Sequence, residues 1–80
     1  MATEMEIQGE LIRLRAMLLS GRARQIVKDA GLTTVAVGEI IGIAQPNAWN
    51  ALAGKQFPRR GPALKLIRLL DQLEVVRDAS

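Results

Sequence analysis

Residues 31–55 read GLTTVAVGEIIGIAQPNAWNALAGK, a stretch in which threonine, glycine and proline separate short apolar segments. Thr33 is a residue type that caps helices well, so it predicts a helix over residues 34–41. Gly42 is expected to end that helix, because glycine readily adopts the left-handed conformation found at helix ends. The apolar residues expected to face the core from this helix are Val37, Ile40 and Ile41.

A second short helix is expected directly after Gly42. Pro46 fits the first turn of a helix, and its ring disfavours helical geometry at Gln45, so Gln45 is expected to cap the helix. The helix is expected to end near Ala53, before a glycine. Gly38 lies four residues before Gly42, where the two helices would cross closely. Two short helices around one glycine predict a helix-turn-helix.

Two further helices are expected upstream of this motif. Thr3 followed by Glu6 fits a capping box that opens a first helix, and Gly21 follows its end. Four residues at helical spacing form one apolar stripe on that helix: Ile7, Leu11, Leu14 and Leu18. The second helix ends at Gly31, and its expected inward face consists of Ala23, Ile26, Val27 and Ala30.

A loop over residues 55–61 and a last helix are expected downstream. Pro62 is expected to open this helix, which runs to about Arg77. Its broad apolar face comprises Leu66, Leu69, Leu70, Leu73 and Val76, with Leu64 and Val75 on the opposite side. A helix that is apolar on more than one side needs more than one neighbour, either the N-terminal helix or a second subunit.

The chain is therefore expected to be all-α, a compact bundle of about five helices with a central helix-turn-helix. Residues 1–20 form an N-terminal helix that is a candidate for dimerisation or partner binding. Residues 21–78 form the predicted DNA-binding domain. Eighty residues suffice for one small domain, whose core alone gives marginal stability, so such a chain often pairs.

Composition excludes several classes of function. The chain contains no Cys and no His, which removes disulfides, thiolate zinc sites, the usual general base and the usual transition-metal ligand. No run of apolar residues approaches the ~20 needed to span a membrane, and the first ten residues are acidic, unlike a signal peptide. We expect a cytoplasmic protein that is not an enzyme and uses no cofactor and no metal.

The charge is unevenly distributed along the chain. Residues 40–70 contain five basic residues and no acidic residue: Lys55, Arg59, Arg60, Lys65 and Arg68. Such a local excess indicates either a surface for a polyanion or an ordinary solvated face. Arg22, Arg24 and Lys28, which are interspersed with acids, are interpreted as ordinary surface.

The sequence resembles the phage repressor and Cro-type (XRE) helix-turn-helix family. The resemblance runs without a gap over residues 31–55 and loosely to Leu73. It rests on Gly31-Leu32-Thr33, Val37-Gly38, Ile41-Gly42-Ile43, Ala51-Leu52 and Gly54-Lys55. This chain has Val27 and Leu52 where the family often buries an Arg–Glu ion pair, and a matched apolar replacement can preserve such a contact. Gln45-Pro46, Gly54-Lys55 and Phe57 are similar to HigA-like antitoxins.

The resemblance implies which residues contact DNA bases. Gln45 and Asn50 match positions that read bases in the family, and Asn47 is a candidate for a base or a phosphate. Pro46 offers only apolar contact to a thymine methyl group. Trp49 either contacts sugar and base edges, contacts a protein partner, or is half tucked against Phe57. The alternative is that the polar residues form a cap and a solvated face.

Phosphate contacts are expected from hydroxyls and cations around the motif. Thr33 and Thr34 begin the helix that crosses the DNA backbone in this family. Lys55, Arg59 and Arg60 lie in the predicted loop after the recognition helix, which the family also uses on the backbone.

The expected function is that of a small Cro-like repressor. It would bind double-stranded DNA at an inverted-repeat operator as a homodimer, without a small-molecule ligand. The alternative is an antitoxin that uses its N-terminal helix to bind a toxin and its helix-turn-helix for autoregulation. The stripe from Ile7 to Leu18 discriminates between them: a stripe packed on the chain's own core is structural, whereas an exposed stripe indicates a partner.

Overall fold

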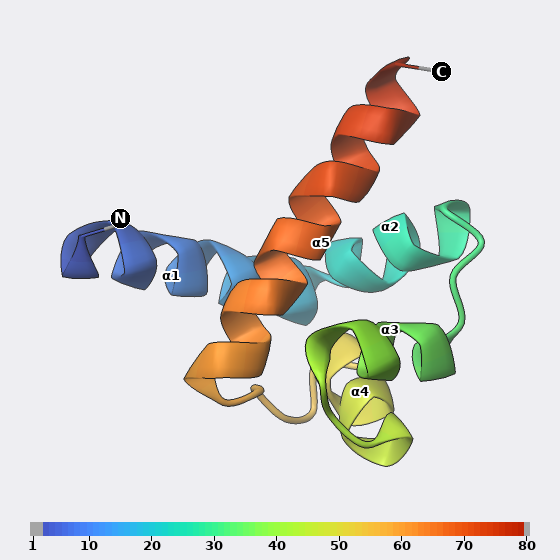
Figure 1. Cartoon of the computed structure of the whole chain (residues 1–80), viewed down its shortest axis with the longest axis horizontal. Coiled ribbons are helices and arrows are strands. Elements are labelled where there is room, and N and C mark those ends of the chain that lie inside the picture. Colours follow the sequence, from blue (N-terminus) through green and yellow to red (C-terminus); the bar gives the residue numbers. More distant parts are fainter. Residues whose placement is uncertain (1–2, 80) are drawn as a thin grey trace.

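The computed structural model describes residues 3–79, with side chains described for residues 3–76 (Figure 1). Residues 1 and 2 of the predicted N-terminal segment lie outside the described residues. Within the described part there are five helices and no strand: α1 (Glu4–Ser20), α2 (Arg22–Asp29), α3 (Thr34–Ile41), α4 (Gln45–Leu52) and α5 (Arg60–Ala79). The predicted all-α bundle of about five helices is confirmed.

The helices are arranged around α5. This helix contacts α1, α2 and α3, and α1 also contacts α2. The short helices α3 and α4 pack on each other at one end of the molecule, while the last turns of α5 project from the opposite end (Figure 1). None of the helices in the described part is both long and apolar enough to cross a bilayer.

One hydrophobic core joins all five helices. Its largest fully buried side chains are Leu14, Ile26, Val37, Ile41, Leu66, Ile67 and Leu70. The predicted stripe of α1 contributes directly to it, because Leu14 and Leu18 are buried and Leu11 packs against the buried cluster. The stripe therefore stabilises the chain's own fold.

The turn between α3 and α4 depends on two glycines. Gly42 ends α3 with a φ of 81°, a left-handed conformation that side-chain-bearing residues rarely adopt. The N–H groups of Gly42 and Ile43 both donate to the carbonyl oxygen of Gly38, at 2.8 and 2.9 Å. The close crossing predicted at Gly38 is confirmed: a Cβ there would lie 2.8 Å from the carbonyl oxygen of Ile43 and 3.6 Å from the Cβ of Ala48.

The predicted threonine caps are also confirmed, but the predicted cap of α4 is wrong. The Thr3 and Thr33 hydroxyl oxygens accept hydrogen bonds from the Glu6 and Ala36 N–H groups. Ala44 precedes α4 as its N-cap, and Gln45 is its first residue. Pro46 is accommodated in the first turn because N–H groups there have no partner within the helix.

Two residues predicted to face the core are exposed. Ile40 is 49% exposed, because α3 has only eight residues and turns Val37 and Ile41 toward the core. Ala30 is exposed because it forms the C-cap of α2 rather than part of its inward face.

The predicted start of the last helix is also wrong. α5 begins at Arg60, two residues before Pro62, so Arg60 belongs to the helix and not to the preceding loop. Proline at the third position still falls within the first turn, where its missing N–H costs no helical hydrogen bond. Val76 is exposed, although it was predicted to share the buried face, because the last turns of α5 extend beyond the other helices (Figure 1).

Candidate nucleic-acid interface

The outward side of α4 carries polar side chains. Its inward side is formed by Ala48, Ala51 and Leu52, all buried. Gln45, Pro46 and Asn47 are exposed at the N-terminal end of the helix, and Asn50 is half-buried one turn further on. The small alanines allow α4 to lie close against α3. As a result, the first turn of α4, with two side-chain amides, is presented to solvent.

Trp49 lies on one flank of α4 and is 44% exposed. The Lys55 Nζ atom lies 4.8 Å from the centre of its ring, a cation–π contact. Phe57 is instead covered by the Arg15 guanidinium, 4.6 Å from the ring centre. Each of the two aromatic rings thus lies beside a cation, and nearly half of the Trp49 surface is open to solvent.

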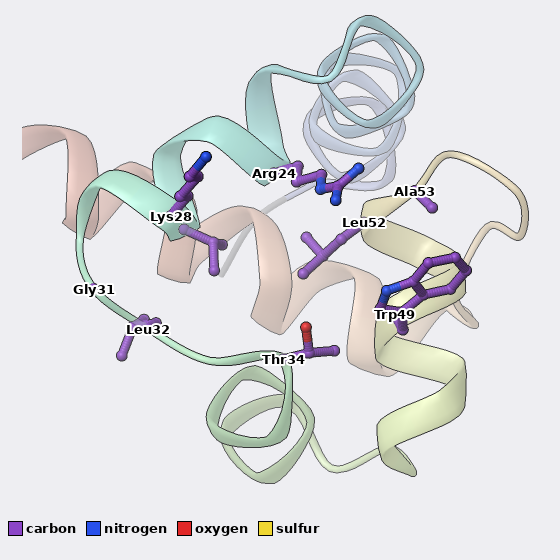
Figure 2. Close-up of a pocket in the computed structure, with 9 residues that line it drawn as sticks. Arg24, Lys28, Gly31, Leu32, Thr34, Trp49, Leu52 and Ala53 are labelled. Atoms are coloured by element: carbon purple, nitrogen blue, oxygen red, sulfur yellow. The ribbon is translucent and has the colours of Figure 1, made fainter.

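A hollow of about 370 Å³ lies between α2, α3 and α4 on the Trp49 side (Figure 2). Its polar rim comprises Arg24 and Lys28 from α2, Thr34 from α3, and Trp49, whose indole nitrogen is turned toward the hollow. Two cations, a hydroxyl and an indole N–H are hydrogen-bond donors, and the lining contains no acidic side chain. This composition suits an anion.

Val27 and Leu52 lie beneath this hollow. Both are buried and belong to the core, and both also line the hollow. The hollow therefore has an apolar floor and a cationic rim. A low-dielectric floor strengthens the attraction between the rim and an anion.

Arg24 and Lys28 were missed as candidate site residues. The i, i+4 spacing that aligns them on one face of α2, around Val27, was the available signal. Their neighbour Arg22 pairs with Glu74 on α5, at 3.3 Å between side-chain nitrogen and oxygen. The interpretation of Arg22 as ordinary surface remains compatible with that ion pair.

A second hollow, of about 380 Å³, flanks α4 on the side of the α3–α4 turn. Asn47, Gln56 and Arg59 line it, together with the turn residues 42–44 and Pro62. The structure thus places Arg59 beside Asn47 and Lys55 beside Trp49. Two of the predicted phosphate contacts therefore lie next to predicted base contacts.

The remaining predicted phosphate contacts have different surroundings. Thr34 lines the first hollow, whereas the hydroxyl oxygen of Thr33 already accepts the Ala36 N–H, at 3.1 Å. Arg60 forms an ion pair with Glu4 of α1 and is not brought to α4. Hydrogen bonds from Arg60 and then Gln8 hold the pKa of Glu4 below its ordinary value.

The described residues contain no group of three or more His, Cys, Asp or Glu side chains that could hold a metal ion. No protein-family model matches this chain, and no curated protein or solved structure is significantly similar to it. The functional assignment therefore rests on the geometry of α4 and its two hollows.

Proposed function

We propose that this protein is a sequence-specific DNA-binding regulator that uses α4 as its recognition helix. The observation that carries the proposal is the position of α4. Its exposed amide side chains lie between two hollows, one rimmed by Arg24 and Lys28 and the other lined by Arg59. A helix in the major groove of B-DNA has a phosphate backbone on each side, so cations are needed on both flanks.

Within this arrangement the N-terminal turn of α4 would read bases. Gln45 and Asn47 are exposed, and side-chain amides of this kind can form two hydrogen bonds with adenine. Pro46 would contact a thymine methyl group. Asn50 lies further from the N-terminus of α4 and is half-buried. Its main-chain carbonyl oxygen accepts a hydrogen bond from the Lys55 N–H, at 2.9 Å. Its side-chain amide is assigned to a base contact deeper along the helix.

Phosphate binding would fall to the rims of the hollows. Thr34 and the N-terminus of α3 lie on the same hollow as Arg24 and Lys28, and helix N-termini favour anions. Lys55 and Arg59 extend the positive surface around the end of α4. Neither hollow has an acidic side chain in its lining, so no carboxylate there competes with a phosphate for these cations.

The organisation of the helices favours a small Cro-like repressor over an antitoxin. The antitoxin alternative assigned partner binding to the stripe from Ile7 to Leu18. Leu14 and Leu18 of that stripe are buried in the chain's own core. The part of the stripe from Leu11 to Leu18 is therefore not available to a toxin. The proposed partner is double-stranded DNA, bound by a homodimer at an inverted repeat.

Selection of binding sites from random duplex DNA tests the proposal. We expect an enriched inverted repeat, bound at least about 10³-fold more tightly than random DNA at the same salt concentration. Asn47→Ala and Gln45→Ala should weaken binding to the selected site by about 1–3 kcal/mol and affect random DNA little. Weak binding without an enriched sequence would contradict the assignment of α4 as a recognition helix.

A further inference from the structure

The face of α1 opposite the core carries a second row of apolar and small residues. The row consists of Met5, Gly9, Ile12, Ala16 and Leu19, all exposed, and we refer to it as the outer seam. Met5 is 84% exposed, and Ile12 and Leu19 are each 69% exposed. Three large apolar side chains thus lie on one helix face at intervals of two turns, with only small residues between them.

The spacing of the outer seam is that of a helix-pairing surface. Successive members are separated by four, three, four and three residues. This is the alternation by which two helices pack along a common seam. The seam covers almost the whole of α1, about 21 Å along the helix axis. Gly9 and Ala16 carry little or no side chain, so a second helix could approach the backbone closely at those two positions.

The order of residue sizes along the seam is symmetric about Ile12. Met5 and Leu19 lie seven residues on either side of Ile12, and the small residues Gly9 and Ala16 lie three residues before it and four after it. Two identical helices that run antiparallel about a twofold axis at Ile12 would place Met5 opposite Leu19. They would also bring Gly9 of each helix within one residue of the position opposite Ala16 of the other. This self-complementarity is what an isologous dimer interface requires.

The charges of α1 favour the same orientation. Glu6 and Glu10 precede Ile12 and Arg15 follows it, whereas Glu4 and Arg13 are already paired with Arg60 and Asp71 of the same chain. An antiparallel pair brings the acidic half of one helix beside the basic half of the other. A parallel pair would place like charges side by side, which is unfavourable.

We propose that a second copy of this chain covers the outer seam, and that α1 pairs antiparallel with α1 of that copy about Ile12. The inference adds an interface to the homodimer of the proposed function, but it rests on α1 alone. A helix pair of this length lies at the low end of specific interfaces, so the dimer should form in a concentration-dependent way.

Sedimentation equilibrium without DNA tests the pairing, and failure of dimerisation is thus distinguishable from failure of DNA binding. We expect dimer formation by the unaltered chain and a dissociation constant raised about 10-fold or more by Ile12→Lys, which places two cations at the twofold axis. Val75→Lys is the matched control: Val75 on α5 is 68% exposed and lies outside the seam, so this variant should dimerise normally. Circular dichroism would check that both variants remain helical.

Cross-linking tests the orientation, because the chain contains no Cys of its own. We expect an oxidised mixture of Met5→Cys and Leu19→Cys chains to form mainly the mixed disulfide, identified by its mass. A monomeric unaltered chain would overturn the proposal and leave the seam to a partner of different sequence. Normal dimerisation of Ile12→Lys, or a predominant Met5→Cys self-disulfide, would also overturn it.

Discussion

Gly38 faces the carbonyl oxygen of Ile43 so closely that a Cβ on residue 38 would lie 2.8 Å from that oxygen. The same Ile43 donates its N–H to the Gly38 carbonyl, at 2.9 Å. The two residues thus hold the end of α3 against the start of the turn into α4. This contact sets the position of α4, and therefore the position of the proposed recognition surface.

Gly38→Ala should destabilise the protein by about 1–2 kcal/mol. Alanine is normally the better helix former by up to about 1 kcal/mol, but here its methyl group would press on backbone that cannot rotate away. Urea denaturation measures the free energy of unfolding. At an unhindered helical position the same change would instead stabilise the protein by up to about 1 kcal/mol. A gain in stability for Gly38→Ala would contradict the role given to the Gly38–Ile43 contact.

The fluorescence of Trp49 should report the charge of the first hollow. Trp49 is the only tryptophan, and Arg24, Lys28 and Lys55 lie around it. The positive potential should concentrate iodide near the ring, so iodide should quench more effectively than caesium at equal ionic strength. The double substitution Arg24→Gln with Lys28→Gln should reduce iodide quenching.

Quenching by neutral acrylamide is the control for that measurement. It depends on exposure and not on charge, so the double variant should leave it unchanged. If iodide and caesium quench the unaltered protein equally, the hollow does not attract anions.

Arg59 and Arg60 should differ in their contribution to DNA binding, although they are adjacent. Arg59 lines the hollow beside Asn47, whereas Arg60 is already paired with Glu4. Arg59→Ala should lower the slope of log K against log salt by about one unit. Arg60→Ala should lower it by less, because its charge is partly compensated by a carboxylate. A larger loss of slope for Arg60→Ala would show that DNA displaces Glu4.

Local signals made much of the fold predictable. The Thr33 cap, the glycine at position 42 and the close crossing at Gly38 each depend on residues within one or two turns, and the structure confirms them. The first hollow was not predictable in this way, because it depends on the relative positions of α2, α3 and α4. α1 carries two apolar stripes, and only the packing of the helices determines which of them faces the core. The stripe containing Leu14 is buried, and the outer seam is exposed.

The ion pair between Arg13 and Asp71 should make the attachment of α1 to α5 sensitive to acid. The two terminal guanidinium nitrogens of Arg13 donate hydrogen bonds to the two carboxylate oxygens of Asp71, at 2.7 and 2.9 Å. These hydrogen bonds hold the pKa of Asp71 below its ordinary value. A carboxylate with a lowered pKa stabilises the fold above its unfolded-state pKa of about 4, and this contribution is lost as the pH falls through the folded-state pKa.

Asp71→Asn should therefore reduce the free energy of unfolding at pH 7 and have less effect at strongly acidic pH. The loss at pH 7 should not exceed about 1 kcal/mol, because both side chains are more than a third exposed and solvent screens the pair. Arg13→Gln should cost a similar amount, and combining both changes should cost little more than either alone. Additive losses, or a loss that does not change with pH, would show that the two side chains stabilise the protein independently of their ion pair.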